Sequence, residues 1–232
     1  MSEGAVTALA RFHRDEVLNC TRCPLSEGRT QVVPGSGDPD AEILFVGEAP
    51  GYHEDKQGVP FVGQAGSLLD ELLAGIGLTR ADVFVANVLK CRPPSNRDPR
   101  PEEIEACESH LFRQIGIISP ALVCTLGNFA TKLLSGRPEG ITRVHGHELS
   151  LTLGGREVLL YPLFHPAAAL YTPAMKDTLR ADFARIPGLV SALREGAPAP
   201  PLPERSEPTA TAKPASEAAV QAEPEHDQLG LF

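Results

Sequence analysis

The amino-acid sequence predicts an α/β fold, with helices layered on a mainly parallel sheet, followed by a disordered tail. Strand-like apolar runs alternate with segments of helical periodicity over most of the 232 residues. The length suits one domain plus a tail, since a single core seldom divides below about 250 residues. With 42% hydrophobic residues the chain can bury a core, and no run reaches the roughly 18 apolar residues of a membrane span. We expect a folded domain at 1–195 and a tail at 196–232.

Short apolar runs predict the strands of the sheet. They lie at 42–46, 83–89 and 121–126, and each is followed by a glycine or a lysine. Their length and boundaries are typical of buried strands. The segments 149–153 and 157–161 flank Gly154-Gly155, which is a turn signal of a β-hairpin.

The helices are predicted by spacing and by their ends. Leucine and isoleucine recur at helical spacing over 67–76. Pro101 and the two glutamates after it are typical of a helix start and predict a helix over 101–118. A further helix is expected at 128–134. The last, 176–194, contains Pro187, which should kink or interrupt it.

The tail differs in composition from the rest of the chain. Residues 196–227 hold seven of the 22 prolines and few large aliphatic side chains. Such a segment buries too little apolar area to offset the entropy of ordering it. The segment 196–232 also has six acidic and two basic residues, a net −4 of the total charge of −9.

The charge limits how the protein can bind nucleic acid. A net charge of −9 argues against binding through bulk positive charge. Basic residues nevertheless gather around one loop, namely Lys90, Arg92, Arg97 and Arg100. A local basic patch on an acidic protein therefore remains open.

Five cysteines stand in a chain that begins without a secretory signal, so we expect a cytoplasmic protein without a disulfide framework. Cys20 and Cys23 form a C-x2-C pair that lets two thiolates reach one metal centre, and Cys91 and Cys107 follow separately. Four thiolates suit zinc or a [4Fe–4S] cluster, whereas isolated cysteines are often small buried hydrophobes, as we expect for Cys124. Zinc ribbons usually repeat the C-x2-C pair, so its single occurrence favours iron–sulfur.

A glycine-rich loop follows the first predicted strand. It begins Gly47-Glu48-Ala49-Pro50-Gly51 and continues through Glu54 and Phe61 to Gly66. Loops at the carboxyl ends of parallel strands are where open α/β folds bind ligands. No Gly-Lys-Ser/Thr or G-x-G-x-x-G pattern is present, so neither a P-loop nor a dinucleotide fingerprint is indicated. Taken alone, the loop could equally be a simple connection.

Three motifs in a fixed order carry a specific resemblance. They are GEAPGYHEDKQGVPFVGQAG at 47–66, NVLKCRPPSNR at 87–97 and FHP at 164–166. With the four cysteines they closely resemble the family 4 uracil-DNA glycosylases, the iron–sulfur branch of their superfamily, over residues 16–190. The resemblance implies a three-layer αβα sandwich around a four-stranded, mainly parallel sheet. It also implies a [4Fe–4S] cluster on Cys20, Cys23, Cys91 and Cys107, and excision of uracil from single- or double-stranded DNA in base excision repair.

The resemblance implies roles for individual residues, because a base must leave the helix before its glycosidic bond can be reached. Phe61 matches the family's stacking phenylalanine. Asn87 would pair with uracil O4 and N3–H and reject cytosine, whose donor and acceptor are reversed. His165 matches the histidine that stabilises negative charge on uracil O2. Glu54 matches the position that is thought to exclude the methyl group of thymine.

The attacking water is less defined by the sequence. Related families carry a carboxylate or asparagine where this chain has Ala49, so no strong base is evident there. Glu48 is the nearest candidate to orient the water, and the sequence leaves the assignment open. Ala167 also replaces a serine that often follows the His-Pro pair in the family, which puts a contact to phosphate in doubt.

Contacts to DNA are expected on both sides of the site. Arg92, Arg97 and Arg100 would touch phosphates rather than bases. Leu170 or Tyr171, just beyond His165, would wedge into the gap left by the flipped base.

The end of the chain carries a second resemblance. Gln228, Leu229, Leu231 and Phe232 form a Q-L-x-L-F pentapeptide, similar to the one by which bacterial repair and replication proteins dock on the polymerase sliding clamp. At the tip of a flexible tether such a motif raises the local concentration of the enzyme near replicating DNA. We otherwise expect a monomer.

Three other classes of protein were weighed. An electron-transfer iron–sulfur protein would cluster its cysteines tightly and would need none of Phe61, Asn87 and His165. The branch of the superfamily that stays covalently attached to DNA carries a nucleophilic histidine before the fourth cysteine, and residues 92–106 contain no histidine. A protein that acts only as a tether would work through its tail.

Overall fold

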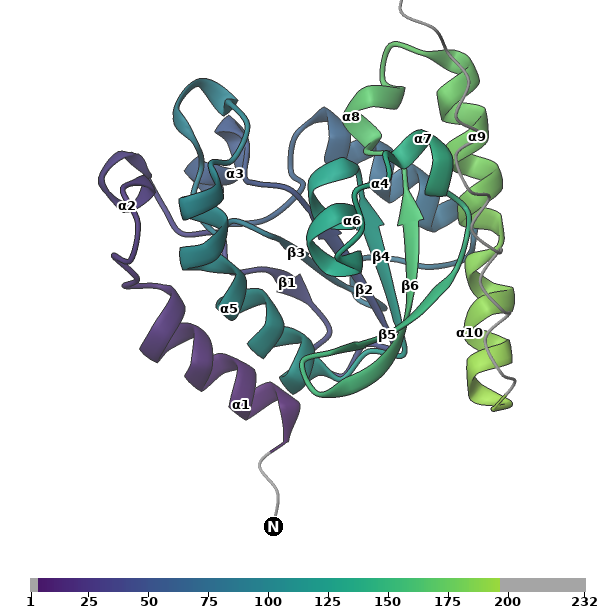
Figure 1. The fold of residues 1–232 in the computed structure, drawn as a ribbon, viewed down its shortest axis with the longest axis horizontal. Helices are drawn as coiled ribbons and strands as arrows, with labels where there is room; N and C mark the ends of the chain where they lie inside the picture. Colours follow the sequence, from purple (N-terminus) through teal and green to yellow (C-terminus); the bar gives the residue numbers. More distant parts are fainter. Residues whose placement is uncertain (1–3, 197–232) are drawn as a thin grey trace, which may run out of the picture. The chain divides into compact units, whose positions relative to one another are not determined.

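The computed structural model describes residues 4–196, which form a mixed sheet between two layers of helices (Figure 1). The strand order is β1-β3-β2-β4-β6-β5. The four central strands run parallel: β3 (Phe84–Asn87), β2 (Ile43–Gly47), β4 (Leu122–Leu126) and β6 (Arg156–Leu163). The edge strands β1 (Ser36–Gly37) and β5 (Leu149–Leu153) are antiparallel to their neighbours. The α/β class is therefore confirmed, and the two edge strands extend the expected four-stranded sheet to six.

Alternate residues of the central strands face two separate cores. Leu44 and Val46 pack with α1 (Ala5–Phe12), α5 (Pro101–Ile118) and α6 (Asn128–Ser135). Ile43 and Phe45 pack on the opposite face with α4 (Gln64–Gly75), α9 (Pro173–Ala184) and α10 (Ile186–Arg194). Burial of strand residues on both faces explains why these strands read as continuous apolar runs rather than as alternating ones.

Most element predictions are confirmed with small shifts at the ends. Helix α5 has the predicted bounds, and the long C-terminal helix is divided into α9 and α10 at Arg185, two residues before Pro187. Several short elements were not predicted from the sequence. They are the π-helical turn His13–Val17, the 3-10 turn Pro94–Asn96, α2 (Leu25–Gly28), α3 (Tyr52–Gln57), α7 (Ile141–Val144) and α8 (Pro166–Ala169), besides α1 and β1.

The parallel strands end at one edge of the sheet, and hydrogen bonds continue beyond them. Val88 N–H donates to the Gly47 carbonyl at 2.9 Å, and Gly127 N–H donates to the Leu163 carbonyl at 2.9 Å. The end of β3 is thereby joined to that of β2, and the end of β4 to that of β6. The predicted tail and its clamp-like motif lie outside the described residues, and none of the helices within 4–196 is long and apolar enough to cross a membrane.

Candidate active site

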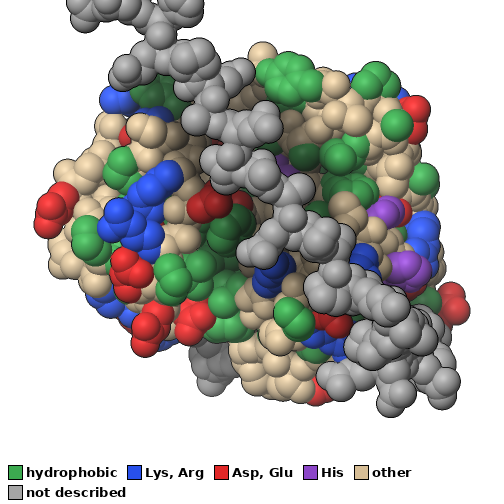
Figure 2. All heavy atoms as spheres, turned by 45° about the horizontal axis from the view of Figure 1, so that its top comes forward, with side chains coloured by type: hydrophobic (Ala, Val, Ile, Leu, Met, Phe, Trp, Pro, Cys, Tyr) green, Lys and Arg blue, Asp and Glu red, His purple; other side chains and the backbone are tan. Residues whose placement is uncertain are grey.

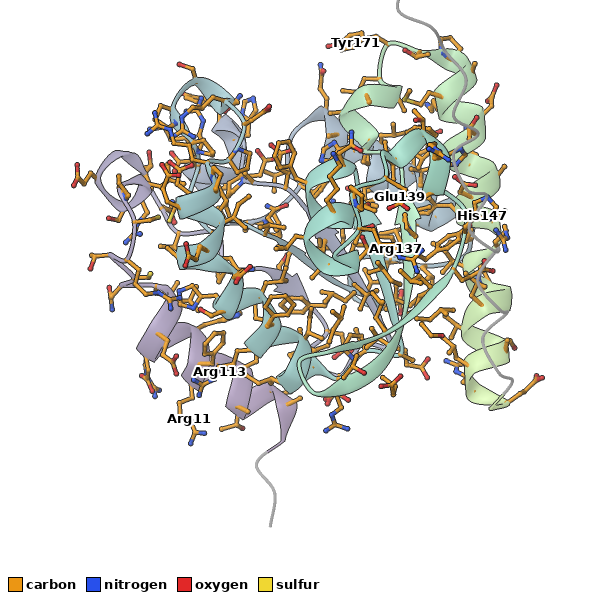
Figure 3. All side chains as sticks on the ribbon, in the orientation of Figure 1. Arg11, Arg113, Arg137, Glu139, His147 and Tyr171 are labelled. Carbon is orange, nitrogen blue, oxygen red and sulfur yellow. The ribbon has the colours of Figure 1, made fainter. Side chains whose placement is uncertain are left out.

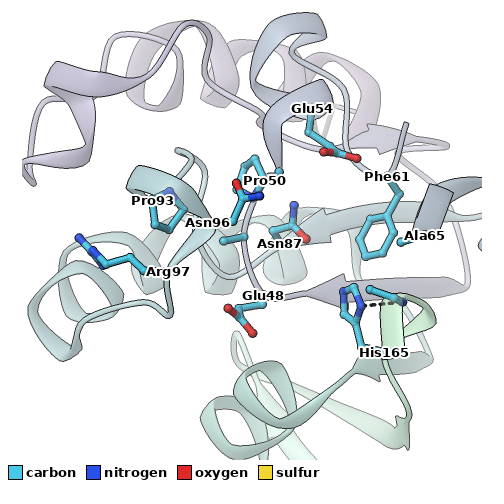
Figure 4. Close-up of a pocket in the computed structure, with 13 residues that line it drawn as sticks. Glu48, Pro50, Glu54, Phe61, Ala65, Asn87, Pro93, Asn96, Arg97 and His165 are labelled. Atoms are coloured by element: carbon cyan, nitrogen blue, oxygen red, sulfur yellow. Dashed lines mark hydrogen bonds between the residues drawn. The ribbon is translucent and has the colours of Figure 1, made fainter. Parts of the chain in front are cut away.

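A pocket of about 360 Å³ opens where the loops after β2, β3 and β6 meet (Figure 4). The size is that of a site for a small organic ligand. It brings together seven of the residues proposed from the sequence to act in the site, which are Glu48, Ala49, Glu54, Phe61, Asn87, Arg97 and His165. Its other lining residues are Pro50, Gly51, Ala65, Pro93, Asn96 and Ala167.

Asn87 presents an unpaired polar atom to this pocket. The residue ends β3 and is only 2% exposed, and its Oδ1 has no hydrogen-bond partner among the described residues. The close packing depends on Gly47 at the end of β2, since a Cβ there would lie 2.4 Å from Asn87 Oδ1 and 2.7 Å from Phe61 Cζ. A buried acceptor without a donor costs about 1–3 kcal/mol, so the site is built to receive an N–H group.

Phe61 forms the aromatic wall of the pocket. Its ring lies 5.6 Å from that of His165 at an interplanar angle of 28°, and the two labelled side chains face each other in Figure 4. Its backbone has a φ of 55°, a conformation that is rare for a bulky residue. Arg80 Nη2 holds this turn by donating to the Phe61 carbonyl at 2.9 Å and to the Gly66 carbonyl at 3.3 Å. The sequence analysis missed Arg80 because it lies outside the three motifs.

His165 is held in one tautomer. Its Nδ1 accepts a hydrogen bond from Ala167 N–H at 3.1 Å, so the proton of the neutral ring belongs to Nε2. Burial lowers the pKa of His165 to about 4, although the charge of Glu54 opposes the shift. The side chain therefore offers a neutral N–H donor to the pocket at pH 7.

Two carboxylates line the same pocket in different surroundings. Burial, reinforced by the negative charge of Asp98, raises the pKa of the Glu48 carboxyl to about 7. Glu54 Oε1 instead accepts from the N–H groups of Val62 and Gly63, both at 3.0 Å. Glu54 thus fixes the loop that carries Phe61, and Glu48 is poised to change its protonation state near neutral pH.

The predicted DNA-contacting arginines differ in their surroundings. Arg97 lines the pocket and is paired with Glu103, at 2.5 Å from Nη2 to Oε1 and 2.9 Å from Nη1 to Oε2. Arg92 Nε donates to Asn96 Oδ1 at 2.7 Å. Arg100 is exposed and begins α5 as its N-cap. Where described residues are visible in Figure 2, basic, acidic and hydrophobic side chains are interspersed on the face that carries the carboxyl ends of the strands.

The two predicted wedge residues are not equally free to project. Leu170 is partly buried and packs against the core beside α4 and α9. Tyr171 is 83% exposed and lies at the outer end of the α8–α9 connection, as labelled in Figure 3. Of this pair, only Tyr171 extends away from the fold.

Cys91 lies close enough to Cys20, Cys23 and Cys107 to interact electrostatically with them, whereas Cys124 lies in β4 and packs in the other core. Arg29 Nη1 joins two of their segments, since it donates to Cys91 Sγ at 3.3 Å and to the Cys20 carbonyl at 2.6 Å. Burial raises the pKa of Cys91, and the neighbouring Cys23 and Cys20 thiols add to the shift. Burial likewise raises the pKa of Cys107 to about 11, and Cys91 and Cys23 add to it.

The donor set fits an iron–sulfur cluster in kind and in number. The four cysteines are free thiols, two buried and two partly buried, and a [4Fe–4S] cluster takes one thiolate for each iron. Across residues 4–196, no three His, Cys, Asp or Glu side chains are grouped as ligands of a single metal ion. A cluster is larger than one ion, so its ligands stand further apart.

Comparison with known proteins places the chain in a family. The sequence profile described as the uracil DNA glycosylase superfamily matches residues 34–185. A type-4 uracil-DNA glycosylase from Sulfurisphaera tokodaii is 48% identical over 178 residues, which cover 75% of this chain and 81% of the relative. One from Thermotoga maritima is 49% identical over 67% of this chain and 80% of the relative. A type-5 uracil-DNA glycosylase from Thermus thermophilus is 36% identical over 52% of this chain and 62% of the relative. The chain belongs to the uracil DNA glycosylase superfamily and, within it, to the type-4 uracil-DNA glycosylases.

Proposed function

We propose that this protein is a DNA repair hydrolase that cleaves the N-glycosidic bond of uracil in DNA, releasing free uracil and leaving an abasic site. The observation that carries the proposal is the unpaired Oδ1 of Asn87 beside the stacked rings of Phe61 and His165. A uracil base supplies the N–H group that this acceptor lacks and a flat face for Phe61. Membership of the type-4 family supports the same reaction.

The side-chain amide of Asn87 selects the base. Its Oδ1 accepts from uracil N3–H, and its Nδ2 donates to uracil O4. Cytosine presents an amino group and an unprotonated N3 at these positions. The Nδ2 donor would then face another donor, and the Oδ1 acceptor would face another acceptor. Because the groups are buried, such a mismatch discriminates strongly between the two bases. Glu54 and the loop that it fixes exclude thymine, because they leave no room in the pocket for its methyl group.

Bond cleavage develops negative charge on the base and positive charge on the sugar. As the C1′–N1 bond breaks, its electron pair passes to the uracil ring, where Nε2–H of His165 donates to O2. A water molecule adds to C1′ and gives one proton to solvent, and the uracil anion takes up one proton from solvent at N1, which yields free uracil. We assign the orientation of this water to Glu48, whose carboxylate also faces the positive sugar, because Ala49 offers no polar group. The electrophilic sugar needs a positioned water rather than a strong base.

We further propose a [4Fe–4S] cluster on Cys20, Cys23, Cys91 and Cys107. When bound, it joins the N-terminal segment, the loop after β3 and helix α5 through metal–thiolate bonds. The purified protein should be brown and contain about four irons. Cys107→Ala should lose colour and thermal stability together, whereas Cys124→Ala, the matched control, should keep the colour. Stoichiometric zinc without iron or acid-labile sulfide would contradict the cluster.

The remaining contacts are also proposals. Arg92, Arg97 and Arg100 contact phosphates, and Tyr171 or Leu170 fills the gap left by the flipped base.

The segment 228–232 docks on the sliding clamp, and the enzyme is otherwise a cytoplasmic monomer. The isolated tail peptide should bind the clamp in about the micromolar range, and deletion of 228–232 should abolish binding without changing excision from short oligonucleotides. If the full-length protein does not associate with the sliding clamp of its own organism at high micromolar concentration, the motif is accidental.

A strand-cleavage assay tests the proposed function. The protein is incubated with an oligonucleotide that contains a single uracil, and alkali then cleaves abasic sites. We expect cleavage at the uracil and an intact strand when thymine stands there instead, with a hypoxanthine strand defining the range of bases. An iron-loaded protein that leaves the uracil strand intact would overturn the proposal, and a reversible redox couple in that protein would favour electron transfer.

A further inference from the structure

The rim of the pocket carries an exposed aromatic side chain that the proposed reaction does not use. Tyr52 begins α3, directly after the pocket residue Gly51, and is 52% exposed. The guanidinium carbon of Arg92 lies 5.2 Å from the centre of its ring, and Nζ of Lys56 lies 5.9 Å from the same point. Two cations therefore converge on the ring of one tyrosine, and that residue remains about half exposed.

This cluster joins the two loops that form one side of the pocket. Tyr52 belongs to the loop region after β2, and Arg92 to the loop after β3. Arg92 is also held by Asn96 at 2.7 Å, and Asn96 lines the pocket from a turn in which its φ is 53°. The position of the tyrosine is thus tied to the pocket through hydrogen-bonded and stacked groups rather than left to a free loop.

A nucleotide that enters the pocket carries its neighbours to the rim, because adjacent nucleotides are covalently joined. At the rim on this side the chain offers an aromatic face and two positive charges within one cluster. Proteins that bind single-stranded nucleic acid use this combination, in which a base stacks on the ring and the cations pair with phosphate. Stacking tolerates any base, since every base has a flat face.

We propose that Tyr52, Arg92 and Lys56 form a stacking subsite for the base of a nucleotide adjacent to the one excised. The inference rests on the proposed function and adds a binding site to it. Tyr52 supplies the stacking face, and Arg92 and Lys56 hold the phosphate of the same nucleotide. Because an unpaired neighbouring base stacks without first leaving a partner strand, the subsite favours single-stranded over double-stranded substrate.

A double-mutant cycle across the interface tests this subsite. Binding of wild type and Tyr52→Ala is measured on single-stranded oligonucleotides with one non-cleavable 2′-fluoro-deoxyuridine, by fluorescence anisotropy. Matching oligonucleotides lack the base on its 5′ or 3′ neighbour. Tyr52→Ala should weaken binding about tenfold on the complete strand. On one of the two base-lacking strands, the one without the base that stacks on Tyr52, the substitution should have no effect. Tyr52→Phe, which keeps the ring, should bind like wild type.

Arg113→Ala is the matched control, because it also removes a cation that lies over an aromatic ring. The guanidinium carbon of Arg113, in α5, lies 5.1 Å from the centre of the ring of Phe12, in α1. Figure 3 shows Arg113 far from Tyr171. It should bind like wild type on every strand. Equal weakening by Tyr52→Ala on complete and base-lacking strands would overturn the subsite, as would unchanged binding. Uracil release by the wild type is measured in parallel. If that release is absent, the proposed function fails; if it is present without coupling, only the subsite fails.

Discussion

The ammonium nitrogen of Lys90 lies 2.7 Å from the backbone carbonyl oxygen of Asn87 and 2.6 Å from Oε1 of Gln114. Lys90 is only 1% exposed, which is rare for a lysine. Its backbone N–H points at Cys107 Sγ, 3.3 Å away, and Cys91 follows it in the chain. One residue therefore supports both the end of β3 that carries Asn87 and the proposed cluster.

Lys90→Met should slow excision more than it weakens DNA binding. The substitution removes the Lys90 donor from the backbone carbonyl of Asn87 and from Oε1 of Gln114, at about 1–3 kcal/mol for each group. It also frees the peptide that positions the Asn87 side chain. Single-turnover excision, DNA affinity, iron content and thermal unfolding check this. The exposed Lys132→Met is the control and should match wild type throughout. Wild-type excision by an iron-replete Lys90→Met protein would remove Lys90 from this role.

The raised pKa of Glu48 predicts that the excision rate declines on the acidic side of neutral pH. If its carboxylate orients the water, the excision rate falls as pH decreases through about 7, the raised pKa of Glu48. Asp98→Asn removes the like charge that contributes to this raised pKa, so the limit should move to lower pH. Single-turnover rates between pH 5 and 9 measure the shift. Asp40→Asn, at an exposed site, should leave the profile in place. An unchanged profile in Glu48→Gln would assign the water to another group.

His165→Ala should slow excision by roughly 10²–10³, the usual effect of losing one donor to a developing anion. Because the imidazole of His165 is neutral above its pKa of about 4, its donor is present throughout the neutral range. DNA affinity should change little, since His165 acts mainly in the transition state. Single-turnover kinetics with excess enzyme, together with a binding titration, separate the two quantities. Equal losses in rate and affinity would indicate a role in binding the ground state.

Acid should destabilise the fold through three histidines. Burial lowers the pKa values of His13, His110 and His165 to about 4 each, from 6.5. Between these values the unfolded chain binds more protons than the folded one, so the free energy of unfolding falls as pH decreases from about 6.5 to about 4. Urea unfolding at pH 7 and pH 5 measures the loss. His13→Gln should reduce the pH dependence, and a free energy of unfolding that does not change over this range would contradict the burial argument.

Arg100→Ala should weaken DNA binding about equally across sequences and reduce the salt slope by about one unit. Arg97→Ala should also lower stability, because Arg97 is paired with the buried carboxylate of Glu103. Binding titrations between 50 and 300 mM salt give the slopes, and denaturation separates the two effects. Identical slopes for wild type, Arg92→Ala, Arg97→Ala and Arg100→Ala would place the DNA elsewhere.

The sequence predicted the strands and long helices well because burial on both faces leaves a clear apolar pattern, as at β2 and β4. The pocket residues could be named because they stand in motifs. Arg80 could not, since nothing in its surroundings reveals that it reaches back to the Phe61 carbonyl. The pairing of Arg97 with Glu103 and the contact between Tyr52 and Arg92 likewise arise only when separate segments meet. The short helix α3 carries no strong periodic signal and depends on its tertiary setting.

The central claim is that the unpaired Oδ1 of Asn87 reads the N3–H group of uracil. Release of the free base is therefore measured by mass spectrometry from two oligonucleotides, one with uracil and one with N3-methyluracil at the same position. Methylation removes the one N–H group that donates to Asn87 Oδ1. It leaves in place O2, the oxygen on which negative charge develops as the base departs. The account predicts rapid release of uracil and no measurable release of N3-methyluracil. Release of both bases at the same rate would show that Asn87 does not recognise this edge.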